Sequence, residues 1–300
     1  MDTKELVKTI KHLEIHTNRK VNEIFAGNYK SSFRGQGLEF SDLRKYEEGD
    51  DARHIDWLIT ARQGRPYVKK FQETRELTTI IMADISDSME FTTAKKTKSR
   101  ILIETVAYIL FSALKNNDKF GAIIFADQIY AYIPPKKGRK HLLYILREII
   151  QGFSIQEKKK TNLSAALDFF NKTVKKRSIS FLLSDNLRDD DCVLDKGLRA
   201  LKIANQKHDF IYVNIFDNFE KKIESGYPNL KMVNSETGEI GSFDLSNKKL
   251  INNYNQIRSR RYAEEFDFLN KNRIDYLSIA TTANVYKDLL LFFRKRALKF

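Results

Sequence analysis

The residues best suited to chemistry form a short run in which an aspartate is followed by two serines at alternate positions. Asp84, Ser86 and Ser88 make up this run, at the end of the apolar segment 78–86. One carboxylate and two hydroxyls from a single turn form an all-oxygen set, which suits Mg²⁺ or another hard cation such as Mn²⁺ or Ca²⁺. Taken alone, the run is equally typical of a serine-rich turn that caps the next helix.

The segments around this run predict the sheet that must position it. From residue 78 onward, short apolar runs rich in β-branched and aromatic residues alternate with stretches of helical periodicity. This alternation is the pattern of a parallel sheet with crossover helices. We expect strands at 78–86, 120–127, 179–185, 210–216 and 274–281, and helices at 98–116, 139–151, 162–176, 192–205, 247–271 and 284–297. The sequence therefore predicts an α/β fold, with a doubly wound, mostly parallel sheet of the Rossmann type.

Three other segments fall outside this alternation. The run 129–135 ends in two prolines that cannot donate to a sheet, so we expect an antiparallel edge strand there. The segment 230–245 is expected to form a hairpin around 236–238, or a small excursion from the alternation. Residues 1–77 are expected to form a separate part: amphipathic helices within 1–30, then a turn-rich module at 31–77 that is dense in charge and glycine. Residues 78–300 are expected to form the sheet domain.

Two more oxygen-bearing residues fall at the edge where the first run lies. Thr161 opens a predicted helix after a polar loop, and Asp185 ends a predicted strand. The carboxyl ends of parallel strands share one edge of the sheet, where the ligand crevice of such folds opens. These two side chains can therefore converge with Asp84, Ser86 and Ser88 on a single cation.

This set resembles the metal-ion-dependent adhesion site of von Willebrand factor A domains, which uses Asp-x-Ser-x-Ser, then a Thr, then a strand-terminal Asp. All of these positions are matched, so the resemblance implies a von Willebrand factor A-like fold. It implies that Ser86, Ser88 and Thr161 contact the metal, with Asp84 and Asp185 contacting it directly or through water. One coordination position would remain open. In that family an acidic side chain of a protein partner fills it.

The stretch from 33 to 89 carries a second, independent likeness. It resembles the bacterial family catalogued as domain of unknown function 58, in which two charged, glycine-containing segments precede a von Willebrand A-like domain. The matching residues are Gly35, Gly37, Glu39, Phe40, Asp42, Leu43, Arg44, Tyr46, Gly49, Asp50, Asp51, Arg53, Ile55, Asp56, Trp57, Ala61, Arg62, Val68 and Lys69. Members of that family are typically associated with MoxR-type AAA+ ATPases, so the resemblance implies such a partner. Some members carry transmembrane helices.

Composition and charge limit the function further. A net charge of +14 favours anionic partners, but the aromatic residues mostly fall inside apolar runs and do not alternate with Lys or Arg. We therefore expect no nucleic-acid partner. The single cysteine, Cys192, rules out a cysteine-cluster metal site and suits a reducing compartment. The opening residues lack the features of a secretory signal, and no window is apolar enough for a membrane span, so we expect a cytoplasmic protein.

Lysines flank the predicted metal edge on both sides. Lys95, Lys96 and Lys98 follow the Asp-x-Ser-x-Ser turn, and residues 158–160, all lysines, precede Thr161. We expect either a ring of positive charge that steers an acidic partner to the metal, or two solvated loops with no such role.

Three classes of function fit these features. The leading hypothesis is a non-catalytic, metal-dependent adaptor that couples an AAA+ ATPase to a target protein during assembly or maturation of a complex. A Mg²⁺-dependent phosphotransferase of the haloacid dehalogenase type also places an Asp after a first parallel strand, but it needs a second Asp where Ser86 stands. A nucleic-acid binder rests on the net charge alone.

Overall fold

The chain divides into two compact units. The computed structural model describes residues 38–73, 77–155, 161–187, 194–223, 230–233, 240–243 and 248–298. Its contacts assign the described residues up to 73 to a smaller unit and those from 77 onward to a larger one. The helices expected within 1–30 and the turn expected at 236–238 lie outside the described residues. The assignment of residues 1–30 to the part before residue 77 therefore remains a prediction.

The smaller unit is a hairpin with two short helices in its connection. β1 (Leu38–Lys45) pairs antiparallel with β2 (Tyr67–Glu73), and η1 (Ala52–His54) and α2 (Trp57–Gln63) lie between them in the chain. Polar contacts hold its turns. Arg44 lies 2.5 Å from Asp50, and Arg53 lies 2.9 Å from Asp51. The Asp56 carboxylate accepts hydrogen bonds of 3.1 and 3.2 Å from the second and third N–H groups of α2, and thereby caps that helix.

Trp57 and Leu58 begin α2 and are 70% and 68% exposed. Neither side chain therefore belongs to the core of the smaller unit, whose buried apolar residue is Val68.

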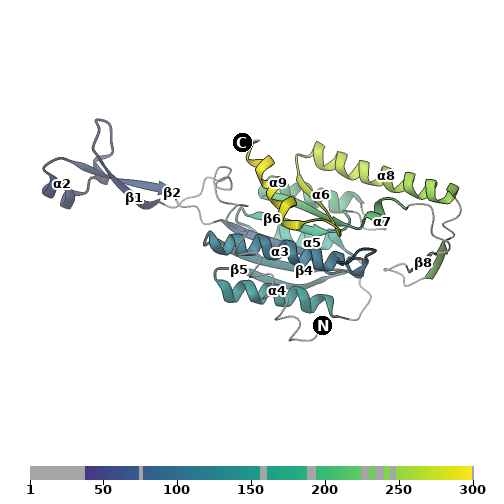
Figure 1. Cartoon of the computed structure of the whole chain (residues 1–300). Coiled ribbons are helices and arrows are strands. Elements are labelled where there is room, and N and C mark those ends of the chain that lie inside the picture. Colours follow the sequence, from purple (N-terminus) through teal and green to yellow (C-terminus); the bar gives the residue numbers. More distant parts are fainter. Residues whose placement is uncertain are drawn as a thin grey trace. The chain divides into compact units, whose positions relative to one another are not determined.

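The larger unit is built on a six-stranded sheet in the order β10-β7-β6-β3-β4-β5 (Figure 1). Its strands are β3 (Thr78–Asp84), β4 (Lys119–Phe125), β5 (Ile129–Lys136), β6 (Ile179–Ser184), β7 (Asp209–Phe216) and β10 (Asp275–Ala280). All neighbouring pairs are parallel except β4 and β5. The doubly wound, mostly parallel sheet is therefore confirmed, as is the antiparallel edge strand.

Helices cover both faces of this sheet. They are α3 (Lys98–Lys115), α4 (Arg139–Phe153), α5 (Leu163–Thr173), α6 (Leu194–Lys207), α7 (Asn218–Lys221), α8 (Lys248–Lys271) and α9 (Val285–Ala297), with the 3₁₀ turn η2 (Asp87–Glu90) after β3. The predicted hairpin is present as β8 (Leu230–Val233) and β9 (Ile240–Phe243).

The side chains of the central strand β3 alternate between the two faces, as strand geometry requires. Ile80 and Met82 are fully buried in a cluster with Leu167 of α5 and Leu201 of α6. The helices α3, α4 and α9 pack together over the opposite face, as Figure 1 shows. Because β3 is covered on both sides, the residues at its carboxyl end start from a rigid base. Among the residues that the structure describes, no helix combines the length and apolar character that a membrane crossing requires.

Candidate metal centre

The candidate site lies at the carboxyl ends of the central strands. β3 has β4 on one side and β6 on the other. After β3 the chain first adds β4 and β5 on one side, and then crosses to the other side of β3 to form β6. This reversal is the topological switch point at which open α/β sheets form their ligand crevice. Asp84 is the last residue of β3 and pairs with Phe125 of β4, while Ser184 ends β6 and directly precedes Asp185.

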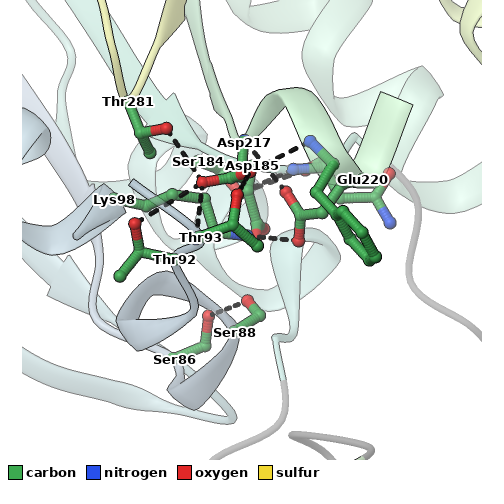
Figure 2. A network of polar contacts seen from close by, with 12 residues as sticks. Ser86, Ser88, Thr92, Thr93, Lys98, Ser184, Asp185, Asp217, Glu220 and Thr281 are labelled. Carbon is green, nitrogen blue, oxygen red and sulfur yellow. Dashed lines mark hydrogen bonds and ion pairs between the residues drawn. The ribbon is translucent and has the colours of Figure 1, made fainter. Parts of the chain in front are cut away.

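Asp84 is fully buried, and both of its oxygens accept hydrogen bonds. The Ser86 backbone N–H donates to Oδ1 at 2.9 Å, and the Ser184 hydroxyl donates to Oδ2 at 2.6 Å. The hydroxyls of Ser86 and Ser88 lie 3.1 Å apart and share a hydrogen bond, which is drawn as a dashed line in Figure 2. The turn after β3 therefore folds back on its own aspartate, and presents two hydroxyl oxygens beside it.

Burial raises the pKa of Asp84, and the nearby negative charge of Asp185 raises it further. A buried carboxylate whose ionisation is opposed by a neighbouring carboxylate is an arrangement that a divalent cation stabilises, because the cation's charge offsets the negative charge. The donors are carboxylate and hydroxyl oxygens, so their chemistry fits a hard cation. Within the described ranges, no three His, Cys, Asp or Glu side chains gather to hold a metal, so any ion here would depend on the hydroxyls as well.

Thr161 lies in a loop whose backbone is bonded to the same edge of the sheet. The N–H of the next residue, Asn162, donates to the carbonyl of Ala126, just beyond β4, at 2.8 Å. The Asn162 side chain caps α5 by accepting from the Ala165 N–H at 3.0 Å. This loop therefore enters α5 next to the carboxyl end of β4. No described hydrogen bond joins the side chain of Thr161 to Asp84 or to the serines, so a direct role of this side chain beside the other four residues remains a prediction.

Sequence reasoning gave Lys98 the wrong environment. Both expected environments, a ring of positive charge or a solvated loop, place Lys98 at the surface, but its side chain is 0% exposed and forms two ion pairs. Its Nζ lies 2.7 Å from Asp185 Oδ2 and 2.7 Å from Glu220 Oε1 (Figure 2). Burial would lower the pKa of Lys98, but the two carboxylates raise it above its usual value. Of the other lysines, Lys95 is exposed and Lys96 pairs with Glu104, while 158–160 lie outside the described residues.

A second polar group beside this site was missed from the sequence. Asp217 follows β7 and is 1% exposed. It accepts hydrogen bonds from the Thr93 N–H at 3.0 Å, the Thr93 hydroxyl at 2.6 Å, the Thr281 hydroxyl at 2.9 Å and the Phe219 N–H at 3.0 Å. Glu220 completes a capping box on Asp217 at the start of α7. The loop after Ser88 is thereby tied to the ends of β7 and β10. The strand-end rule that singled out Asp84 applies to Asp217 as well.

The fold and this site define a doubly wound α/β protein with a cluster of acidic and hydroxyl side chains at the carboxyl edge of its sheet. The chain belongs to the family described as "Protein of unknown function DUF58", whose model matches residues 42–264.

Relatives from two mycobacteria are similar over most of the chain. The chain is 24% identical over 245 residues to uncharacterised proteins of Mycobacterium tuberculosis and Mycobacterium bovis, which covers 82% of this chain and 75% of each relative.

Solved structures with a similar fold are more distant. A conserved hypothetical protein, BatB, from Bacteroides thetaiotaomicron is 14% identical, with 75% of this chain and 100% of that one covered and a TM-score of 0.43. A von Willebrand factor type A protein from Catenulispora acidiphila is 12% identical, with 76% and 43% covered and a TM-score of 0.40. A mussel byssus thread matrix protein with a zinc-occupied MIDAS motif is 12% identical, with 73% and 46% covered and a TM-score of 0.37.

Proposed function

We propose that this chain is a non-catalytic protein-binding adaptor that acts through one divalent metal ion held by Asp84, Ser86, Ser88, Thr161 and Asp185. Mg²⁺ is the expected ion, with Mn²⁺ or Ca²⁺ as substitutes. The observation that carries the proposal is the buried Asp84 carboxylate beside two hydroxyls and a second carboxylate, at the switch point of the sheet.

Each residue has a distinct task in this proposal. Ser86, Ser88 and Thr161 supply neutral oxygens, and the two aspartates supply the charge that attracts the ion. When bound, the ion offers an open position to an acidic side chain of a partner protein. Asp217 holds the loop after Ser88 in place, and Lys98 holds the Asp185 carboxylate. The donors are then preorganised before the ion arrives.

The proposed partner is a MoxR-type AAA+ ATPase, and the proposed setting is the cytoplasm, during assembly or maturation of a protein complex. The resemblance to ATPase-associated members of the family supports the partner. A non-catalytic role is supported by the position two residues after Asp84, where a phosphotransferase of the haloacid dehalogenase type needs a second acid and this chain has Ser86.

Co-purification from the native cell tests this proposal. The tagged chain is isolated with Mg²⁺ or with a chelator, as wild type, Asp84→Asn and Asp127→Asn. Asp127 is the matched control, because it is an exposed aspartate just beyond β4 whose carboxylate accepts from the Tyr130 hydroxyl at 2.8 Å. We expect the ATPase with wild type and Asp127→Asn in Mg²⁺ only, and its absence with Asp84→Asn. Equal recovery of the ATPase in chelator, or with Asp84→Asn, would refute metal-dependent binding.

A further inference from the structure

Lys98 occupies a position that helix energetics alone disfavour. It is the first residue of α3, where the partial positive charge of a helix N-terminus opposes a cation. Its side chain is also completely removed from water. A buried ammonium at a helix N-terminus is tolerated only with strong compensation, and Asp185 and Glu220 provide it at 2.7 Å each.

Carboxylates outnumber the single ammonium around Lys98. Asp84, Asp185 and Glu220 bring three negative charges when ionised, and Lys98 brings one positive charge, so the group carries two negative charges before any ion binds. Asp185 is shared, since one of its oxygens already accepts from Lys98. A metal held by this carboxylate would therefore lie within a few ångströms of the ammonium and be repelled by it.

We propose that Lys98 is a positioning residue that sets the metal affinity of the site: it fixes the Asp185 carboxylate and at the same time weakens its attraction for the ion. This inference rests on the proposed metal site. It means that the ion binds weakly to the free chain, and that the carboxylate of an acidic partner supplies the missing negative charge. Metal and partner then bind cooperatively, each raising the affinity for the other.

Removal of Lys98 should change the metal affinity in opposite directions, depending on whether Lys98 repels the ion or is merely structural. A structural lysine would weaken metal binding when removed, because Asp185 would lose its orientation. A lysine that repels the ion would strengthen it. Coulomb repulsion over a few ångströms is enough to change the affinity by about tenfold or more, even with substantial screening. Removal of Glu220 should act in the other direction, because Lys98 would then be neutralised by Asp185 alone.

The test is titration of the purified full chain with Mn²⁺ alone, followed by calorimetry and by the electron paramagnetic resonance of free Mn²⁺. The variants are E220Q, K98M, the double variant K98M/E220Q and the control K96M. Lys96 is the matched control, because it lies two residues before Lys98 and its 2.8 Å ion pair is with Glu104 and not with Asp185. The double variant removes one charge of each sign, so it leaves no unpaired carboxylate at position 220.

We expect E220Q to bind Mn²⁺ about tenfold more weakly than wild type does. The double variant K98M/E220Q should bind Mn²⁺ at least about tenfold more tightly than E220Q does. The control K96M should have the Mn²⁺ affinity of wild type. Equal affinities of E220Q and K98M/E220Q, with Mn²⁺ binding to wild type, would overturn the role of Lys98 and leave the proposed function standing. Binding to K98M/E220Q that is undetectable in free wild type would support the role of Lys98 and would agree with the weak binding expected for the free chain. Absence of binding in every variant would overturn both.

Discussion

Replacement of Asp217 by asparagine is predicted to destabilise the larger unit, although Asp217 is not itself a proposed metal ligand. Each carboxylate oxygen of Asp217 accepts one backbone N–H, from Phe219 on Oδ1 and from Thr93 on Oδ2, both at 3.0 Å. An asparagine has one acceptor oxygen. Whichever way its amide turns, one of these backbone donors faces an NH₂ group and loses its partner in a partly buried position.

The size of the effect follows from these contacts. Hydrogen bonds to a charged acceptor contribute about 1.5–3 kcal/mol each, and a buried donor without a partner costs a similar amount. We expect Asp217→Asn to lower the free energy of unfolding by about 3 kcal/mol at neutral pH. In a unit of this size that corresponds to a fall in Tm of roughly 6–12 °C.

The loss should depend on pH. Burial opposes ionisation of Asp217, but the hydrogen bonds from Thr93, Phe219 and Thr281 outweigh it and lower the pKa below 3.8. A lowered pKa in the folded state stabilises the fold above 3.8, and this contribution is lost as the pH falls through the folded-state pKa. The wild type and Asp217→Asn should therefore converge in stability in acid.

Calorimetry is the appropriate assay, because the only tryptophan, Trp57, lies in the smaller unit and its fluorescence would not report on the larger one. Asp127→Asn is the control and should change the free energy of unfolding by about 0.5 kcal/mol or less. A Tm for Asp217→Asn within about 2 °C of wild type at neutral pH would show that the polar clamp does not stabilise this edge.

Three further predictions concern the sheet, a buried histidine and the metal. In Gly121→Ala the new Cβ would lie 2.5 Å from the Ile133 carbonyl oxygen and 2.9 Å from the Pro135 nitrogen, so β5 must move. We expect calorimetry to show a fall of about 1–3 kcal/mol in the free energy of unfolding, and an unchanged Tm would contradict this packing. Burial and neighbouring positive charges lower the pKa of His208 below 6.5, so the free energy of unfolding should decrease as the pH falls below 6.5 toward the folded-state pKa. His208→Gln should remove this pH dependence, and a pH dependence that persists in the variant would show that His208 is not its source. Mg²⁺ at 100 times its Kd should stabilise wild type by about 2.7 kcal/mol in thermal unfolding but leave Asp84→Asn unchanged, and an equal shift in both would place the ion elsewhere.

Much of the fold could be predicted because buried parallel strands have a distinctive sequence. The apolar runs that became β3, β4, β6, β7 and β10 are short and rich in β-branched and aromatic residues, and the helices between them have clear periodicity. The prolines of β5 predicted its edge position. The placement of Asp84 and Asp185 followed from the rule that carboxyl ends of parallel strands share one edge.

The environment of Lys98 could not be predicted in the same way. A lysine at the start of a helix after a polar loop is usually exposed, and its local sequence contains nothing that says otherwise. Its burial depends on Asp185 and Glu220, which are 87 and 122 residues away in the chain. Long-range pairing of this kind is set by the tertiary fold. Asp217 differs, because its position directly after a predicted strand was available from the sequence.

Anomalous scattering from crystals of the full chain soaked in Mn²⁺ tests the central claim most directly. We predict one strong peak within about 2.5 Å of the Ser86 and Ser88 hydroxyls, with Thr161 and the two aspartates around it, and no such peak in Asp84→Asn crystals. A peak at another position, or an empty carboxyl edge at saturating Mn²⁺, would contradict a metal centre in this protein.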